Sequence, residues 1–82
     1  MKLRLWGSDP DTDRAQIDRL VALGRERGEE ISVEYVDVVT SVRRAIFEDI
    51  IVTPTMERID PLPRMRIIAM PADLSKMLDL LA

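Results

Sequence analysis

The chain has 82 residues, a net charge of −3 and neither cysteine nor histidine. The missing cysteines exclude disulfides, thiolate metal sites and Cys-x-x-Cys redox chemistry, and without histidine the side chain best suited to acid–base catalysis near neutral pH is absent. A negative net charge without a basic run also argues against nucleic-acid binding, so we expect a protein that is not an enzyme and holds no metal or cofactor.

Residues 2–6 alternate charged and apolar side chains, which predicts a first strand. The N-terminal segment contains no long apolar run, so we expect no signal peptide, no membrane span and a cytoplasmic location. Residues 7–12 are rich in turn formers, and apolar residues then recur at helical spacing, with Asp11 or Thr12 as the expected N-cap of the helix. Gly28 is expected to end it.

Residues 31–39 alternate again and predict a second strand, which should lie parallel to the first because a helix joins the two. Thr40 or Ser41 should cap a second helix. The inward face of that helix is expected to hold five residues: Val42, Ala45, Ile46, Asp49 and Ile50.

Residues 52–59 and 64–69 are short extended segments on either side of Pro61-Leu62-Pro63, a spacing that suits an antiparallel hairpin. A last helix is expected over residues 73–81, and Pro71 just before this range suits the first turn of a helix. The order β-α-β-α-β-β-α predicts one α/β domain over residues 1–82, with a thioredoxin-like, mixed four-stranded sheet and helices on its faces. In such folds a cis-proline opens the third strand, here Pro54.

Residues 52–68 read VTPTMERIDPLPRMRII and resemble the KaiB family of circadian-clock proteins. That family carries a similar threonine-proline-threonine strand, a proline cluster, and then an arginine and paired isoleucines. The resemblance is weaker in four other short stretches, which are residues 3–6, 14–15, 35–38 and 79–81.

The KaiB resemblance implies a clock regulator without catalytic activity, which binds a KaiC-like ATPase ring and recruits KaiA or a clock histidine kinase. The family also switches folds, between a tetrameric ground state and a thioredoxin-like monomer. Residues 69–73 are a shortened version of the family's turn, and Pro71 suits the start of a helix. Both features favour the monomeric thioredoxin-like state, with the tetrameric KaiB ground-state fold as the alternative.

Two surfaces are candidates for partner binding. The second strand should lie at a sheet edge, where free backbone groups could pair with another chain, flanked by Ser32 and Glu34. Equally, Glu34 could only protect that edge from aggregation. The second helix presents a set of residues away from its inward face, with the composition of a binding hot spot: Arg43, Arg44, Phe47 and Glu48. Phe47 could instead pack against the end of the sheet.

Two other functions stay open. A degenerate thioredoxin-like or glutathione-binding protein would use Ser8, which lies where redox relatives of the fold carry their Cys-x-x-Cys motif. A KaiB-like sensor domain of a clock histidine kinase would share the fold and the ring, but no kinase segment is attached to this sequence, which favours the free regulator.

Overall fold

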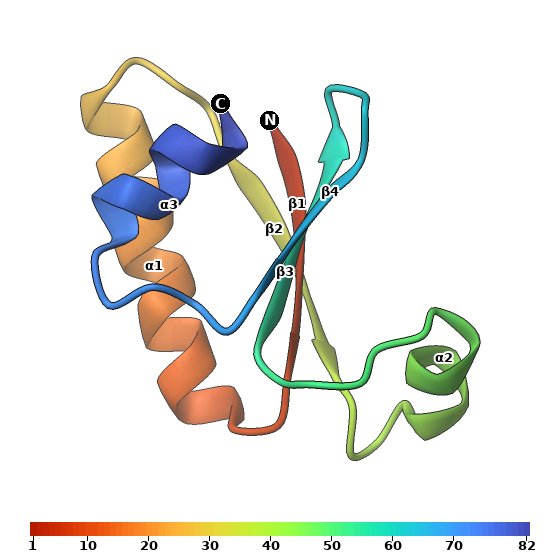
Figure 1. The fold of residues 1–82 in the computed structure, drawn as a ribbon. Helices are drawn as coiled ribbons and strands as arrows, with labels where there is room; N and C mark the ends of the chain where they lie inside the picture. The colour runs from red at the N-terminus through yellow and green to blue at the C-terminus, as the bar shows by residue number, and fades with distance from the viewer.

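The structure is a computed structural model that describes all of residues 1–82. Along the chain its elements are β1 (Lys2–Gly7), α1 (Pro10–Glu26), β2 (Ser32–Asp37), α2 (Val42–Phe47), β3 (Thr55–Asp60), β4 (Met65–Ile68) and α3 (Leu74–Leu81) (Figure 1). The strands form one mixed sheet in the order β2-β1-β3-β4, in which β1 runs parallel to β2 and antiparallel to β3. The thioredoxin-like α/β fold and the edge position of β2 are confirmed.

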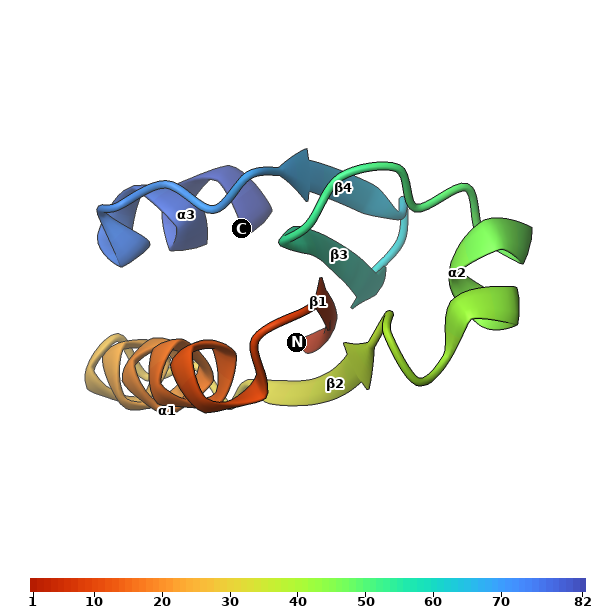
Figure 2. The same ribbon diagram turned by 90° about the horizontal axis from the view of Figure 1, so that it is seen from below.

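The helices divide between the two faces of the sheet. Figure 2 shows α1 and α3 together on one face and the short α2 on the other. The alternation along β1 explains this division, because Leu3 and Leu5 face the two long helices while Arg4 and Trp6 face α2. The main core lies between the sheet and the long helices and contains Leu3, Leu5, Leu20, Ile31, Met56, Met77, Leu78 and Leu81.

The N-terminus of α1 differs from the prediction by two to three residues. Asp9, rather than Asp11 or Thr12, is the N-cap, and its carboxylate accepts from the Thr12 hydroxyl at 2.9 Å and the Thr12 backbone N–H at 3.5 Å. Pro10 then occupies the first helical turn, where a backbone N–H would have no acceptor within the helix, so its absence costs no hydrogen bond.

A buried carboxylate ties the first turn of α1 to the sheet. Asp13 is 8% exposed and accepts a hydrogen bond from the Tyr35 hydroxyl at 2.7 Å. Burial, and then the hydrogen bond to Asp13, raise the pKa of Tyr35. Gly7 is required beside this pair, because a Cβ there would lie 2.0 Å from Asp13 Oδ2.

Helix α2 is shorter and less buried than its apolar pattern predicts. It ends at Phe47, and Asp49 has a positive φ of 56°, so the expected face does not continue through Asp49 and Ile50 as one helix. Ala45 is its only buried residue, whereas Ile46 is 69% exposed. The helix therefore contributes little to the apolar core.

Side-chain hydrogen bonds fix both ends of α3. Asp73 caps its N-terminus by accepting from the N–H groups of Ser75 and Lys76, and Pro71 precedes the helix instead of lying in its first turn. At the other end the buried guanidinium of Arg58 donates to the carbonyl oxygen of Leu81. The same guanidinium also donates to the Pro63 carbonyl oxygen in the β3–β4 turn, at 2.9 Å.

The Thr53–Pro54 peptide bond is cis, and so are Asp60–Pro61 and Leu62–Pro63, for which the sequence carried no expectation. None of the three helices has the length and apolar character needed to cross a membrane.

Candidate protein-interaction surface

Exposed apolar side chains concentrate around α2. Seven of the nine large apolar residues that are exposed belong to this region, and we call them the α2 patch: Val39, Val42, Ile46, Phe47, Ile51, Val52 and Ile68. Phe47 and Ile51 are the most open, at 86% and 91%. A monomer rarely leaves so many apolar side chains together on its surface unless they meet a partner.

The α2 patch contains a small hollow of about 50 Å³. It lies between the chain leaving α2 and strand β4, with Ile51, Val52 and Ile68 among its lining residues. Arg66 reaches its wall and adds the one cationic group there.

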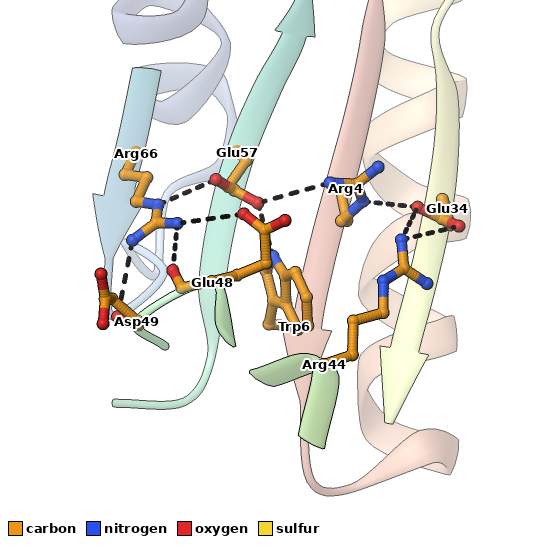
Figure 3. Close-up of polar contacts among 8 residues, drawn as sticks. All are labelled: Arg4, Trp6, Glu34, Arg44, Glu48, Asp49, Glu57 and Arg66. Carbon is orange, nitrogen blue, oxygen red and sulfur yellow. Dashed lines mark hydrogen bonds and ion pairs between the residues drawn. The ribbon is translucent and has the colours of Figure 1, made fainter. Parts of the chain in front are cut away.

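Beneath α2, four charged side chains form a row across the sheet, which we call the charge ladder (Figure 3). Each strand contributes one member, in the order Glu34, Arg4, Glu57 and Arg66. The register requires this arrangement, because Arg4 is the direct cross-strand partner of both glutamates and Glu57 is the direct partner of Arg66. Neighbours of opposite sign on one face stabilise a sheet.

Glu57 is the buried member of the charge ladder, at 3% exposure. It accepts from the indole Nε1–H of Trp6 at 2.6 Å and from Arg66 Nε at 2.8 Å, and Arg4 Nη1 lies 3.9 Å away. Burial raises the pKa of Glu57, but the hydrogen bonds from Trp6 and Arg66 and the two arginine charges outweigh it, so its pKa lies below the ordinary value of 4.5.

Arginines connect α2 to the charge ladder at both ends. Near its start, Arg44 pairs with Glu34 at 3.2 Å and lies over the Trp6 ring, with its Cζ 5.5 Å from the centroid. Just after its end, Arg66 donates to the carbonyl oxygen of Glu48 at 2.5 Å. The hydrogen bond from Arg4, together with the charges of Arg4 and Arg44, lowers the pKa of Glu34 although partial burial opposes the shift.

The residues predicted for α2 separate into two groups. Arg43 and Phe47 are exposed, and Phe47 does not pack against the sheet end. Arg44 and Glu48 instead face the sheet, where Arg44 meets Glu34 and Glu48 Oε2 lies 4.0 Å from Arg66.

On the β2 edge, Ser32 is exposed, while Glu34 is joined to both Arg4 and Arg44. Its ion pairs with Arg4 and Arg44 give Glu34 a structural role. The sequence pattern did not mark Arg4, Trp6, Glu57 or Arg66 as part of this surface. Alternation along a strand shows which of its residues share a face. It does not show which charged residues pair across neighbouring strands.

The structure brings together two residues of the alternative glutathione site, Ser8 and Thr53. Ser8 Oγ lies 3.3 Å from Thr53 Oγ1, beside the cis-proline Pro54. However, three aspartates, Asp9, Asp11 and Asp13, surround this end of α1, and they oppose an anion such as glutathione. The larger hollow, of about 360 Å³, lies elsewhere, at Val21, Arg25 and residues 28–31.

A scan against models of known protein families finds no match, and a search of curated proteins finds no significant one. Among solved structures, the chain is similar to the solution structure of the N-terminal domain of SasA from Synechococcus elongatus. The two are 18% identical with a TM-score of 0.64, and the match covers 98% of this chain and 74% of the SasA chain. At this identity the likeness shows a shared thioredoxin-like fold.

Proposed function

We propose that this chain is a KaiB-like clock regulator that binds a KaiC-type ATPase ring through its α2 patch and performs no catalysis. The α2 patch is the observation that carries the proposal, because a large apolar surface on a small monomer needs a partner to cover it. Two further facts support it: the resemblance of residues 52–68 to the KaiB family, and the fold shared with the N-terminal domain of SasA.

The α2 patch has the composition of a binding hot spot. Phe47 is an aromatic anchor with almost its whole ring in water, and Arg43 beside it has a free guanidinium. Burying such an aromatic at the centre of an interface commonly contributes about 2 kcal/mol or more, while its neighbours exclude water.

Binding to a purified KaiC-type hexamer, measured by biolayer interferometry with ATP present, tests the proposal. The double variant Arg43→Ala/Phe47→Ala should bind at least about 30-fold more weakly, since two hot-spot side chains are lost. Its circular-dichroism spectrum should match that of the native chain, because neither side chain is buried.

Leu62→Ala is the matched control, because Leu62 is 75% exposed but lies in the β3–β4 turn, outside the α2 patch. It should bind like the native chain. An unchanged affinity of the double variant would remove α2 from the interface, and no binding by the native chain would reject the ring as the partner.

A second partner, KaiA or a clock histidine kinase, is proposed for the free edge of β2, next to Ser32 and Glu34. A strand added there would complete the backbone hydrogen bonds that this edge leaves open. Hydrogen exchange should then slow at amides of residues 32–37 when the second partner joins the complex. Unchanged exchange at this edge would contradict strand addition.

A second candidate function is the KaiB-like sensor domain of a clock histidine kinase, which fits the resemblance of residues 52–68 to the KaiB family equally well. The mass of the protein isolated from its own cells separates the two candidates. The free regulator should have a mass near 9.4 kDa, whereas a sensor domain would be part of a much larger chain.

The position of Ser8 beside Thr53 leaves a glutathione-binding protein as a third candidate. Titration with glutathione followed by NMR tests it directly. Shifts clustered at Ser8 and Thr53 would support this function, and we expect none because of the aspartates around the α1 N-terminus.

A further inference from the structure

Helix α2 cannot hold its own position. It has six residues, its N-cap Ser41 makes no side-chain hydrogen bond to it, and Ala45 is its only buried side chain. Helices this short are unstable alone, so contacts with the rest of the protein must keep it in place. The order of the α2 patch therefore depends on those contacts.

Arg66 supplies several of these contacts from a distant part of the sequence. Its guanidinium donates to the carbonyl oxygens of Glu48 at 2.5 Å and Asp49 at 3.5 Å, just past the last helical residue. Carbonyl groups at a helix C-terminus lack partners within the helix and carry its negative partial charge. A cation placed there completes their hydrogen bonds and opposes unwinding.

Glu57 holds Arg66 in the orientation that this contact needs. Glu57 Oε2 accepts from Arg66 Nε at 2.8 Å, and its other oxygen accepts from Trp6. Figure 3 shows Glu57 between Arg66 and Trp6, and because only 3% of Glu57 is exposed, it has almost no surface with which to touch a docked protein. Any effect of Glu57 on binding must pass through Arg66, through Trp6 beneath Arg44 of α2, or through stability.

We propose that Arg66, anchored by Glu57, is the positioning residue for the α2 patch, a clamp that keeps the patch preformed for docking. A preformed surface binds more tightly because less conformational freedom is lost on association. The clamp acts on α2 whatever the partner is. Its effect on binding to a KaiC-type ring rests on the proposed function.

The clamp is tested first without any partner, by hydrogen exchange at the amides of residues 42–51. Arg66→Gln should speed exchange there about tenfold, since removing two or three hydrogen bonds lowers the local opening free energy. Arg64→Gln is the matched control, because it removes the same charge from an exposed residue just outside β4. It should leave exchange in this segment unchanged.

Glu57→Gln should also speed exchange in residues 42–51, and Arg66→Lys should not restore the native rate, because an ammonium cannot bridge Glu57 and both carbonyls. Exchange in β1 and β3 serves as the reference for global unfolding. Equal exchange in Arg66→Gln and native protein would overturn the proposal. So would acceleration of equal size in the core strands, which would show a general loss of stability.

The second readout is affinity for the KaiC-type hexamer. Arg66→Gln and Glu57→Gln should each bind several-fold more weakly, while Arg64→Gln binds normally. Weaker binding by Arg66→Gln with native exchange would show that Arg66 touches the partner directly and would overturn the positioning role. If the native chain does not bind the ring, the proposed function fails, and the exchange comparison alone decides the clamp.

Discussion

At the scale of single residues, the structure depends on two charged side chains that are buried in the sheet. Glu57 and Arg58 are neighbours in β3, both are almost fully buried, and they point to opposite faces of the sheet. Each has its hydrogen bonds satisfied, and the chain leaves no buried side-chain nitrogen or oxygen unpaired. Substitutions of either residue should therefore cost more than substitutions of exposed charges.

Glu57 should make the free energy of unfolding depend on pH in the acidic range. Its pKa is lower in the folded protein than the ordinary 4.5, so the unfolded chain takes up a proton first as the pH falls. The stabilising contribution is therefore present above about pH 4.5 and is lost below it, as the pH falls through the folded pKa. Urea unfolding followed by circular dichroism from pH 7 to pH 3 measures this loss.

The Glu57→Gln variant should lose less stability over that pH range than the native chain, because it lacks the titrating group but keeps Glu34. Curves that fall in parallel would show that Glu57 contributes nothing to the acid dependence.

Arg58 and Arg27 both contact α3, but they should differ in their effect on stability. Arg58→Leu leaves the buried carbonyl oxygen of Leu81 without a donor, which should cost roughly 1–3 kcal/mol, and the loss of the partly buried bond to the Pro63 carbonyl oxygen should add less. Arg27→Gln breaks an exposed ion pair with Asp79 at 2.7 Å and exposed hydrogen bonds to Ser75, and because water replaces these contacts it should cost only about 0.2–1 kcal/mol. Urea denaturation of the two variants gives both values, and equal losses would contradict the distinction.

At the scale of elements, the sequence predicts strands and long helices well and predicts α2 poorly. Strands β1 and β2 alternate cleanly, and their predicted ranges overlap the observed ones closely. For α2, the apolar spacing of Val42, Ala45 and Ile46 indicated a core-facing helix, but only Ala45 is buried. Spacing shows which residues share a face, and it does not show whether the sheet has room to cover that face.

Two helix N-termini offer a matched comparison. Asp73 caps α3 with its carboxylate, so Asp73→Ala should cost about 1 kcal/mol. Ser41 occupies the same position in α2 but makes no side-chain hydrogen bond to the helix, so Ser41→Ala should change stability little. Thermal unfolding of the two variants checks this, and a larger loss in Ser41→Ala would contradict the described cap.

At the scale of the whole molecule, the order of elements was sufficient to predict the topology, because a parallel β-α-β unit followed by an antiparallel hairpin allows few sheet arrangements. The site was only partly predictable. Phe47 and Arg43 were candidates from composition alone, and the structure leaves both exposed. The charge ladder could not be predicted, because it joins residues from all four strands, and its pairs depend on a register that the sequence did not fix.

We expect the chain to be a monomer, with its α2 patch free for a different protein. Size-exclusion chromatography with light scattering should give a mass near 9.4 kDa. A stable tetramer would contradict this and would favour the alternative KaiB ground-state fold.

Trp6 has a consequence for how this protein can be studied. It is the only tryptophan in the chain, it is fully buried, and it lies between Arg44 of α2 and the carboxylate of Glu57. Its fluorescence is therefore an intrinsic optical signal of whether α2 is seated on the sheet. Departure of α2 would admit water to the indole and shift its emission to longer wavelength, so the seating of α2 on the sheet can be followed in real time without any label.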